Sequence, residues 1–318
     1  MKKKCLIVGL GQIGLWYDFK LDPNHFILTH SRAIDLHEDF EIVGAVDFNE
    51  NSNISFENRY KKKSFDKLNV ALNECQPDLV VISTPTEHHL NIFNELIKYR
   101  FVETILCEKP LSYNLDEAKY IVEKSKALGI SLFVNYMRRC DPGVLKIKNI
   151  IDSSSANLYF KGFVWYTKGI YNNGSHMINL IEFWLGPIKQ SCYKSFVRNV
   201  GEFDTEFDFV VEFEKGKIFF MSAWEEKFSH YTIELLHSNG RIRYEDGGEC
   251  IYLNNIENDN KFSDYKKLSN NIIIENEMNK YQLNVLNELS KYFKSKYSTI
   301  CTGAQALQTL EIINNLNK

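Results

Sequence analysis

The sequence lacks the features that mark disulfide-bonded, membrane-spanning and secreted proteins. Its seven cysteines are odd in number, widely spread and never arranged as Cys-x-x-Cys, so we expect reduced thiols in a cytoplasmic protein. No segment approaches the roughly 18 apolar residues that a membrane helix needs, so no membrane association is expected. The lysine-rich start resembles a signal peptide, but glycines interrupt its apolar part and no small-residue cleavage site follows.

An excess of charge of one sign is also missing. The 38 Lys and Arg residues nearly balance the 41 Asp and Glu residues, and the formal net charge is -3. The two lysine triplets, Lys2–Lys4 and Lys61–Lys63, are typical of solvated faces. We therefore expect no nucleic-acid partner, and we predict no metal site. Cys107 ends an apolar run and is predicted to be a small buried residue rather than a nucleophile.

A chain of 318 residues with 44% hydrophobic residues suits two domains. Over residues 1–140, apolar runs alternate with segments of helical spacing, which predicts βαβ units and a doubly wound parallel sheet of the Rossmann type, a dinucleotide-binding α/β domain. Over residues 141–318, the pattern predicts an α+β domain built on an antiparallel sheet with a few helices. We expect this second domain to bind substrate and to form oligomers.

The elements expected in this second domain follow from alternation, hairpin signals and helical spacing. Lys215-Gly216 and Asn239-Gly240 are hairpin turns by composition. Residues 254–271 are polar and predict an exposed loop, and the final helix is expected to pack back towards the N-terminal domain. The predicted strands are 157–167, 188–197, 203–213, 217–224, 231–236 and 241–244, and the predicted helices are 175–185, 275–294 and 303–316.

Three glycines spaced G-x-G-x-x-G follow the first apolar run. Gly9 would allow a sharp turn, Gly11 would let the backbone approach a pyrophosphate, and Gly14 would let helix and strand pack closely. Gln12 and Ile13 would lie in the first helical turn, whose N–H groups would face the phosphates. The alternative is a βαβ turn without a ligand, because 16 glycines can produce this spacing by chance.

Asp47 ends the second strand-like run and is placed to accept from the ribose of a dinucleotide. Its carboxylate would accept from a ribose 2′-OH and repel a 2′-phosphate, and Phe48-Asn49 offers no cation, so we predict NAD(H) over NADP(H). Asp47 lies further downstream than the usual spacing of about 20 residues. Residues 16–30 carry the turn signal Asp22-Pro23-Asn24 and predict a loop inserted before the helix.

Three further segments complete a recognisable set of motifs. They are Thr84-Pro85-Thr86-Glu87-His88-His89, Cys107-Glu108-Lys109-Pro110, and Asn172-Asn173-Gly174-Ser175-His176-Met177-Ile178-Asn179. Together with the glycines, they resemble the Gfo/Idh/MocA family of nicotinamide-dependent sugar and polyol oxidoreductases over nearly the whole chain. The resemblance implies a Rossmann domain, a C-terminal domain with a large open antiparallel sheet, and hydride transfer at a carbohydrate carbinol or carbonyl.

The resemblance implies two catalytic residues. Lys109 matches the catalytic lysine, which could donate to, or take a proton from, the reacting oxygen; the alternative is a surface lysine. His176 matches the acid/base histidine of D-x-G-x-H-x-x-D; the alternative is a core or capping histidine. Asn172 and Asn179 replace both acids of that motif. Amides can bind sugar hydroxyls but cannot take a proton, so the division of labour between Lys109 and His176 stays open.

Other residues are expected to bind cofactor or substrate. His89 would contact the nicotinamide ribose, or else be a polar residue at a helix start, and the remaining cofactor contacts are Thr84, Pro85, Glu108 and Lys109. Arg138 could touch substrate or form a structural salt bridge, and Lys168 could hold an anionic group or be a solvated strand-end lysine. The full set of predicted substrate contacts is Lys109, Tyr136, Arg138, Lys168, Asn172, His176 and Asn179.

The leading functional hypothesis is hydride transfer to or from a secondary alcohol or ketone of a sugar or nucleotide-sugar, with surface-glycan biosynthesis as its narrower form. A polyol or inositol dehydrogenase is the runner-up, and a non-catalytic NAD-binding sensor or corepressor is the rival class. The aromatic-rich strands over 203–213 and 217–224 leave apolar residues on a face that the helices do not cover. We therefore expect a homodimer or homotetramer through the C-terminal sheet.

Overall fold

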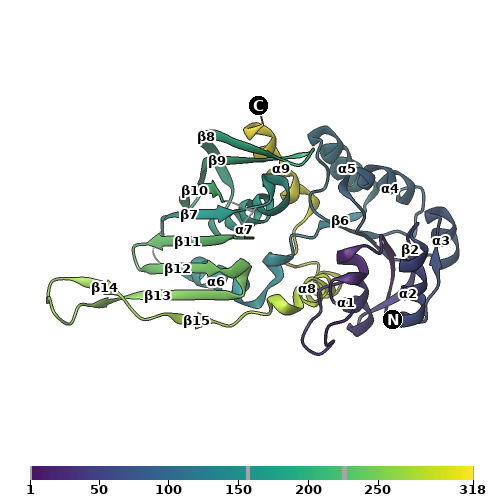
Figure 1. Ribbon diagram of the computed structural model, residues 1–318, viewed down its shortest axis with the longest axis horizontal. Helices are drawn as coiled ribbons and strands as arrows, with labels where there is room; N and C mark the ends of the chain where they lie inside the picture. Colours follow the sequence, from purple (N-terminus) through teal and green to yellow (C-terminus); the bar gives the residue numbers. More distant parts are fainter. Residues whose placement is uncertain (1, 155–157, 224–227, 318) are drawn as a thin grey trace. The chain divides into compact units, whose positions relative to one another are not determined.

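The structure, a computed structural model, describes residues 2–154, 158–223 and 228–317 and divides into two compact units (Figure 1). The first unit runs to Cys140 and also contains Asn279–Glu311; the second contains Asp141–Met278 and the residues from Ile312 on. The chain thus passes from the first unit to the second after residue 140, and Asn279–Glu311 cluster with the first unit. Asn157 and Trp224, ends of two predicted strands, lie outside the described residues.

The first unit is the predicted doubly wound Rossmann domain. Its six strands are all parallel, in the order β3-β2-β1-β4-β5-β6, so the winding reverses between β1 and β4. The apolar runs of β4 and β5 are buried throughout, as expected for parallel strands covered on both faces. The strands are β1 (Lys3–Val8), β2 (Phe40–Val46), β3 (Ser64–Phe65), β4 (Leu79–Ile82), β5 (Thr104–Cys107) and β6 (Ser131–Val134).

Helices of the first unit connect these strands. The predicted helix over 115–128 is present: Asn114 Oδ1 accepts from Asp116 N and Glu117 N, and Gly129 ends the helix in the left-handed region. The helices are η1 (Gln12–Trp16), α1 (His30–Leu36), α2 (Glu50–Tyr60), α3 (Leu68–Cys75), η2 (Thr86–His88), α4 (His89–Leu96), α5 (Leu115–Leu128), η3 (Met137–Cys140) and α8 (Tyr281–Ser295).

The helix predicted over 275–294 starts later than expected. Helix α8 begins at Tyr281, after the single turn η6 (Met278–Lys280). Glu277 N donates to Asp141 Oδ2 and Met278 N donates to Asn276 Oδ1, so side chains take the N–H groups that a longer helix would use. The helical spacing is therefore correct, but the first turn of the predicted helix is wrong.

The second unit is built on a nine-stranded sheet in the order β14-β13-β12-β11-β7-β10-β9-β8, with β15 paired to β13. All neighbouring pairs are antiparallel except β7 and β10, so the sheet is mixed. The strands are β7 (Phe160–Tyr166), β8 (Ile188–Val200), β9 (Asp204–Phe213), β10 (Gly216–Ser222), β11 (Thr232–His237), β12 (Gly240–Glu245), β13 (Cys250–Asn258), β14 (Lys266–Leu268) and β15 (Ile272–Ile274).

The loop predicted over residues 254–271 is wrong, because β13 and β14 form a hairpin there (Figure 1). Asn254 Nδ2 donates to Ser269 O and to Asn271 Oδ1, both at 2.9 Å, and Ser269 Oγ accepts from Asn255 N at 3.0 Å. Amide and hydroxyl side chains thus tie the two strands together. A polar composition therefore concealed a strand pair.

Helices pack on one face of this sheet, and among the described residues the other face carries exposed aromatic side chains such as Tyr193 and Phe219. Helix α6 (Pro142–Ser153) buries Val144, Ile147 and Ile151, and its Val144 carbonyl accepts from Trp184 Nε1 at 3.1 Å. Trp184 belongs to α7 (Ser175–Leu185), which has the predicted bounds. Helix α9 (Gly303–Leu316) also has the predicted bounds, and its residues up to Glu311 cluster with the first unit. The turn η4 (Gly169–Gly174) precedes α7, and η5 (Asp246–Gly248) precedes β13. No helix in the described parts of the chain is long and apolar enough to cross a membrane.

Candidate functional site

The three glycines of the motif meet three different demands. Gly9 has φ +102°, and a Cβ there would lie 2.7 Å from the Ser83 carbonyl; a Cβ at Gly14 would lie 2.2 Å from Gly9 O. Gly11 has an ordinary φ of -72°, and a Cβ there would meet nothing within 4 Å. Backbone conformation and close packing therefore require glycine at positions 9 and 14. Gly11 is not required by contacts within the protein, and it leaves room for a bound ligand.

Asp47 connects the end of β2 to the glycine-rich loop. Its Oδ2 accepts from Leu10 N at 2.6 Å and its Oδ1 accepts from Asn49 N at 2.8 Å. The carboxylate therefore sits at the carboxyl edge of the sheet, next to the point where the strand order reverses. Ribose binding by Asp47 stays a prediction.

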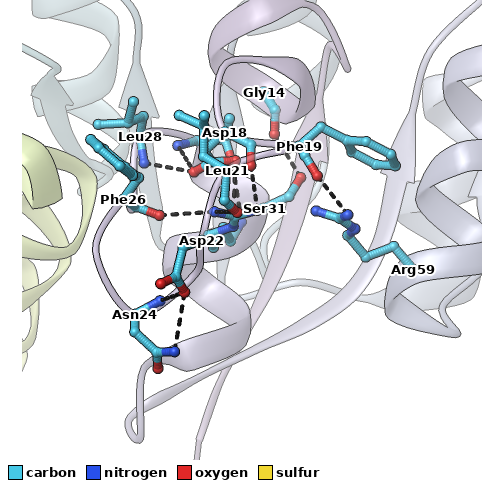
Figure 2. Close-up of polar contacts among 12 residues, drawn as sticks. Gly14, Asp18, Phe19, Leu21, Asp22, Asn24, Phe26, Leu28, Ser31 and Arg59 are labelled. Atoms are coloured by element: carbon cyan, nitrogen blue, oxygen red, sulfur yellow. Dashed lines mark hydrogen bonds and ion pairs between the residues drawn. The ribbon is translucent and has the colours of Figure 1, made fainter.

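The long spacing between the glycines and Asp47 arises from an insert at residues 17–29, between η1 and α1 (Figure 2). Asp18 is fully buried and accepts from Leu28 N, Thr29 N and Thr29 Oγ1 at 2.6 to 2.9 Å. Arg32 forms an ion pair with Asp18 and donates to the carbonyls of Asp18, Leu21 and Phe26. Charged hydrogen bonds thus fix the path of the insert.

Arg59, the cation that could compensate a 2′-phosphate, is engaged by the insert. Its Nη2 donates to Phe19 O at 2.6 Å, and its guanidinium lies 3.7 Å from the centre of the Phe19 ring (Figure 2). A stacked and hydrogen-bonded guanidinium loses these contacts if it turns to another anion. The arrangement around Arg59 thus favours the NAD(H) prediction.

The Thr84-Pro85 segment follows β4 on the same edge. The Thr84 hydroxyl oxygen is buried and has no hydrogen-bond partner among the described residues. His89 is also buried, with Nε2 3.1 Å from Thr84 O and Nδ1 3.2 Å from Leu111 O, and burial lowers its pKa. His89 thus bridges the loops after β4 and β5, and its contact with a ribose stays a prediction.

Glu108 and Lys109 follow β5. Glu108 Oε1 accepts from His30 Nε2 at 2.8 Å and from Asn135 Nδ2 at 2.6 Å, whereas Oε2 accepts no hydrogen bond from the described residues. Burial raises the pKa of Glu108, but the bonds from His30 and Asn135 and the charge of Lys109 outweigh it, and the net shift is downward. Glu108 is therefore a carboxylate with one oxygen still able to accept.

Neither His30 nor Asn135 was predicted as a site residue. His30 is the first residue of α1 and follows the insert. It lies outside the recognised motifs and far from Glu108 in the sequence, so no local pattern indicates their contact. Tyr136 and Arg138 follow Asn135 at the same edge and are both buried. In the first unit, the predicted site residues thus follow the ends of β1, β2, β4, β5 and β6, and they lie at the carboxyl edge of the sheet.

The second unit collects the remaining predicted residues in η4 and the start of α7. Lys168 is exposed and has a left-handed backbone, φ 64°, immediately before η4. Asn172 and His176 are four residues apart, and His176 and Asn179 three apart, so they share one side of this helical segment. Asn172 is exposed, whereas His176 and Asn179 are buried.

Two carboxylates of β9 hold η4 in place. Asp204 accepts from Tyr171 N at 2.9 Å and from Asn172 N at 3.0 Å, and burial raises its pKa despite these bonds. Glu206 accepts from Gly169 N at 3.2 Å and from Arg198 Nε at 2.7 Å. The Asp204 carboxylate therefore lies next to Asn172, but it accepts hydrogen bonds from main-chain N–H groups.

The comparisons with known proteins agree with this fold. A scyllo-inositol 2-dehydrogenase (NAD(+)) from Bacillus subtilis (strain 168) is 30% identical over 162 residues, which is 50% of this chain and 44% of that protein. The match thus spans less than half the length of this relative. The WlbA dehydrogenase from Bordetella pertussis, solved with NADH and UDP-GlcNAcA, has a TM-score of 0.73 at 17% identity, over 100% of this chain and 96% of that one.

A third similar protein is not named as an enzyme. The super-repressor mutant of Gal80p from Saccharomyces cerevisiae has a TM-score of 0.78 at 13% identity, over 100% of this chain and 95% of that chain. At such identities the structural likeness shows the fold alone. Residues 3–136 match the oxidoreductase family with an NAD-binding Rossmann fold. The family match therefore covers the Rossmann part of the chain, residues 3–136, and assigns these residues to the Gfo/Idh/MocA oxidoreductase family.

Proposed function

We propose that the protein is an NAD(H)-dependent oxidoreductase that transfers a hydride to or from a secondary alcohol or ketone of a sugar or cyclic polyol. The observation that carries this proposal is Lys109, which follows the largely buried carboxylate Glu108 at the carboxyl end of β5. That edge also bears Gly11 with open space beside it and the buried Thr84 hydroxyl. Ligands of doubly wound sheets bind at this edge.

The nicotinamide ring supplies the hydride chemistry when the dinucleotide is bound. Lys109 then serves as the proton donor or acceptor at the substrate oxygen, because an ammonium next to a carboxylate can donate to the oxygen on which negative charge develops. His176 in α7 is the second candidate for this proton. Asn172 and Asn179 bind substrate hydroxyls through their amides and carry no proton themselves.

The preference for NAD(H) is supported by Asp47 and by the absence of a cation in the Phe48-Asn49 turn. A 2′-phosphate would face the Asp47 carboxylate, and Arg59 of α2, a cation that could compensate it, is stacked on Phe19. Repulsion between the Asp47 carboxylate and the 2′-phosphate therefore disfavours binding of NADP(H).

The substrate class is supported by the relatives of the chain, which include inositol 2-dehydrogenases and a glucose-6-phosphate 3-dehydrogenase. A direct test incubates the protein with NAD⁺ or NADH and a panel of oxidised and reduced inositols, sugar phosphates and UDP-sugars while nicotinamide absorbance is followed. Turnover with any member at a rate that depends on Lys109 supports the proposal. Dinucleotide binding without turnover across the panel contradicts it.

A second candidate function, binding of dinucleotide and sugar without turnover, is favoured by one observation. Asn172 and Asn179 stand where the family motif has acids, so His176 lacks the adjacent carboxylates of that motif. The same panel distinguishes this sensor from the enzyme, because a sensor binds a panel member without any change in nicotinamide absorbance.

We also propose that the protein is a homo-oligomer through the open face of the second unit's sheet. Tyr193, Val210, Phe219 and Phe163 are aligned neighbours on four adjacent strands, and Tyr193 and Phe219 are each at least half exposed. On the next two strands, the same row continues with the charged residues Glu234 and Arg243. A large apolar patch with a charged margin matches an interface between two copies of the chain.

A further inference from the structure

We propose that His30 is a positioning residue of the proposed cofactor site: it holds one oxygen of Glu108 so that the other oxygen accepts a ribose hydroxyl of the dinucleotide. This inference rests on the proposed function, because it assumes a dinucleotide at the carboxyl edge of the sheet. Nothing in the sequence motifs marks His30, which lies 78 positions before Glu108.

The hydrogen bonds of Glu108 divide its two oxygens into different roles. Both donors, His30 Nε2 and Asn135 Nδ2, bind Oε1, at 2.8 and 2.6 Å. The side chain of His30 is 2% exposed, whereas that of Glu108 keeps 12% of its surface. A carboxylate oxygen can accept two hydrogen bonds, so the protein fills Oε1 and leaves Oε2 for a donor from outside.

The residues on either side of His30 fix the direction of its ring. Thr29 precedes it and is bound through its N–H and hydroxyl to Asp18. Ser31 follows it and donates from Oγ to Gly14 O at 2.6 Å (Figure 2). The first turn of α1 is thus tied both to the insert and to the glycine motif. His30 therefore connects the glycine motif to the end of β5.

Asn135 completes the support from the other side. Its Nδ2 also lies 3.2 Å from Gln282 Oε1, so the amide nitrogen is shared between Glu108 and Gln282 of α8. Asn135 Oδ1 and Gln282 Nε2 have no hydrogen-bond partner among the described residues, so the network is only partly satisfied, and the loss of one of its donors is costly. Removing His30 would leave the carboxylate with one donor and free to turn.

The charged and titratable groups that act on Glu108 come from three elements. His30 of α1 and Lys109, next to Glu108 in the chain, lower the pKa of Glu108. Tyr281 of α8 has a raised pKa, chiefly because it is buried and partly because of the Glu108 charge. Replacing His30 by an apolar residue therefore raises the pKa of Glu108, and the carboxylate that accepts the hydroxyl is lost at a higher pH than in the wild type.

The test is a double-mutant cycle on NADH affinity, measured by fluorescence titration without substrate. His30→Leu should weaken NADH binding about tenfold, the size of one hydrogen bond to a charged group, and should raise the pH at which binding is lost on acidification. His30→Gln, which can keep a donor, should recover most of the affinity. His25→Leu is the matched control, since His25 is an exposed histidine of the insert that binds Asp22.

Glu108→Gln keeps the shape of the side chain and removes the charge, and it should weaken binding by a similar factor. His30→Leu added to Glu108→Gln should then cost little more. Full additivity of the two changes, or an unchanged acid limb in a folded His30→Leu variant, would overturn the proposal. If His30→Leu does not fold, His30→Phe, which keeps the ring shape but has no donor, closes the cycle with Glu108→Gln instead. Because no step requires turnover, failure of the proposed activity leaves this result interpretable.

Discussion

The carboxylate of Asp47 accepts a hydrogen bond from Leu10 N at 2.6 Å, which joins the end of β2 to the middle of the glycine motif. The residue expected to choose between NAD(H) and NADP(H) is therefore held by the loop expected to bind the pyrophosphate. Loss of this carboxylate should affect both the position of the loop and the choice of cofactor.

Asp47→Ser should narrow the preference for NADH over NADPH, because the repulsion of the 2′-phosphate is removed together with the ribose acceptor. Affinities for both cofactors by calorimetry check this, with Asp66→Ser, an exposed aspartate after β3, as the control. Wild-type protein that binds NADPH as tightly as NADH would contradict the prediction and direct attention to Arg59.

Gly11→Ala and Gly14→Ala should separate ligand binding from folding. A Cβ at Gly11 meets no protein atom, so the free energy of unfolding should stay within about 1 kcal/mol of the wild type while dinucleotide affinity falls. A Cβ at Gly14 would lie 2.2 Å from Gly9 O, so this variant should lose stability. Urea unfolding measures the stability of both variants, and NADH titration measures their affinity. NADH binding by Gly11→Ala as tight as that of the wild type would refute the predicted role of Gly11.

Asp18→Asn should destabilise the first unit by about 3–5 kcal/mol, because it leaves Arg32 buried without its carboxylate. Asp22→Asn, in the same insert but half exposed, should change the free energy of unfolding by no more than about 0.5 kcal/mol. Denaturant titration of both variants provides the measurement. Equal, small effects would mean that the buried pair does not hold the insert.

Phe219→Glu should dissociate the proposed oligomer, since it places a charge in the aligned apolar row on the open sheet face. Sedimentation at micromolar concentration should then show a single 37.2 kDa species, whereas the wild type should be larger. Tyr297→Glu is the control, because Tyr297 is an exposed aromatic of the first unit. A monomeric wild type would contradict the assembly proposal.

Local patterns in the sequence predicted those helices and strands whose buried faces are marked by the spacing of their own apolar residues. The helices over 175–185 and 303–316 have the predicted bounds, and the buried runs of β4 and β5 are where continuous apolar segments placed them. The Rossmann fold followed from the alternation of such segments with helical spacing, because short βα connections leave few topologies.

Contacts between distant parts of the chain could not be predicted in the same way. The His30–Glu108 pair, the parallel pairing of β7 with β10, and the return of Asn279–Glu311 to the first unit depend on long-range pairing that periodicity does not encode. The polar hairpin of β13 and β14 was missed because asparagine and serine usually favour turns. The insert at residues 17–29 was recognised, but its buried Asp18–Arg32 pair was not.

The measurement that tests the central claim most directly is steady-state turnover of Lys109→Ala beside its NADH affinity, with Lys98→Ala, an exposed lysine paired with Glu95, as the control. If Lys109 moves the proton at the reacting oxygen, turnover should fall by about 10² to 10⁴ while NADH affinity stays nearly unchanged. Turnover of Lys109→Ala equal to that of the wild type and of Lys98→Ala would contradict the account.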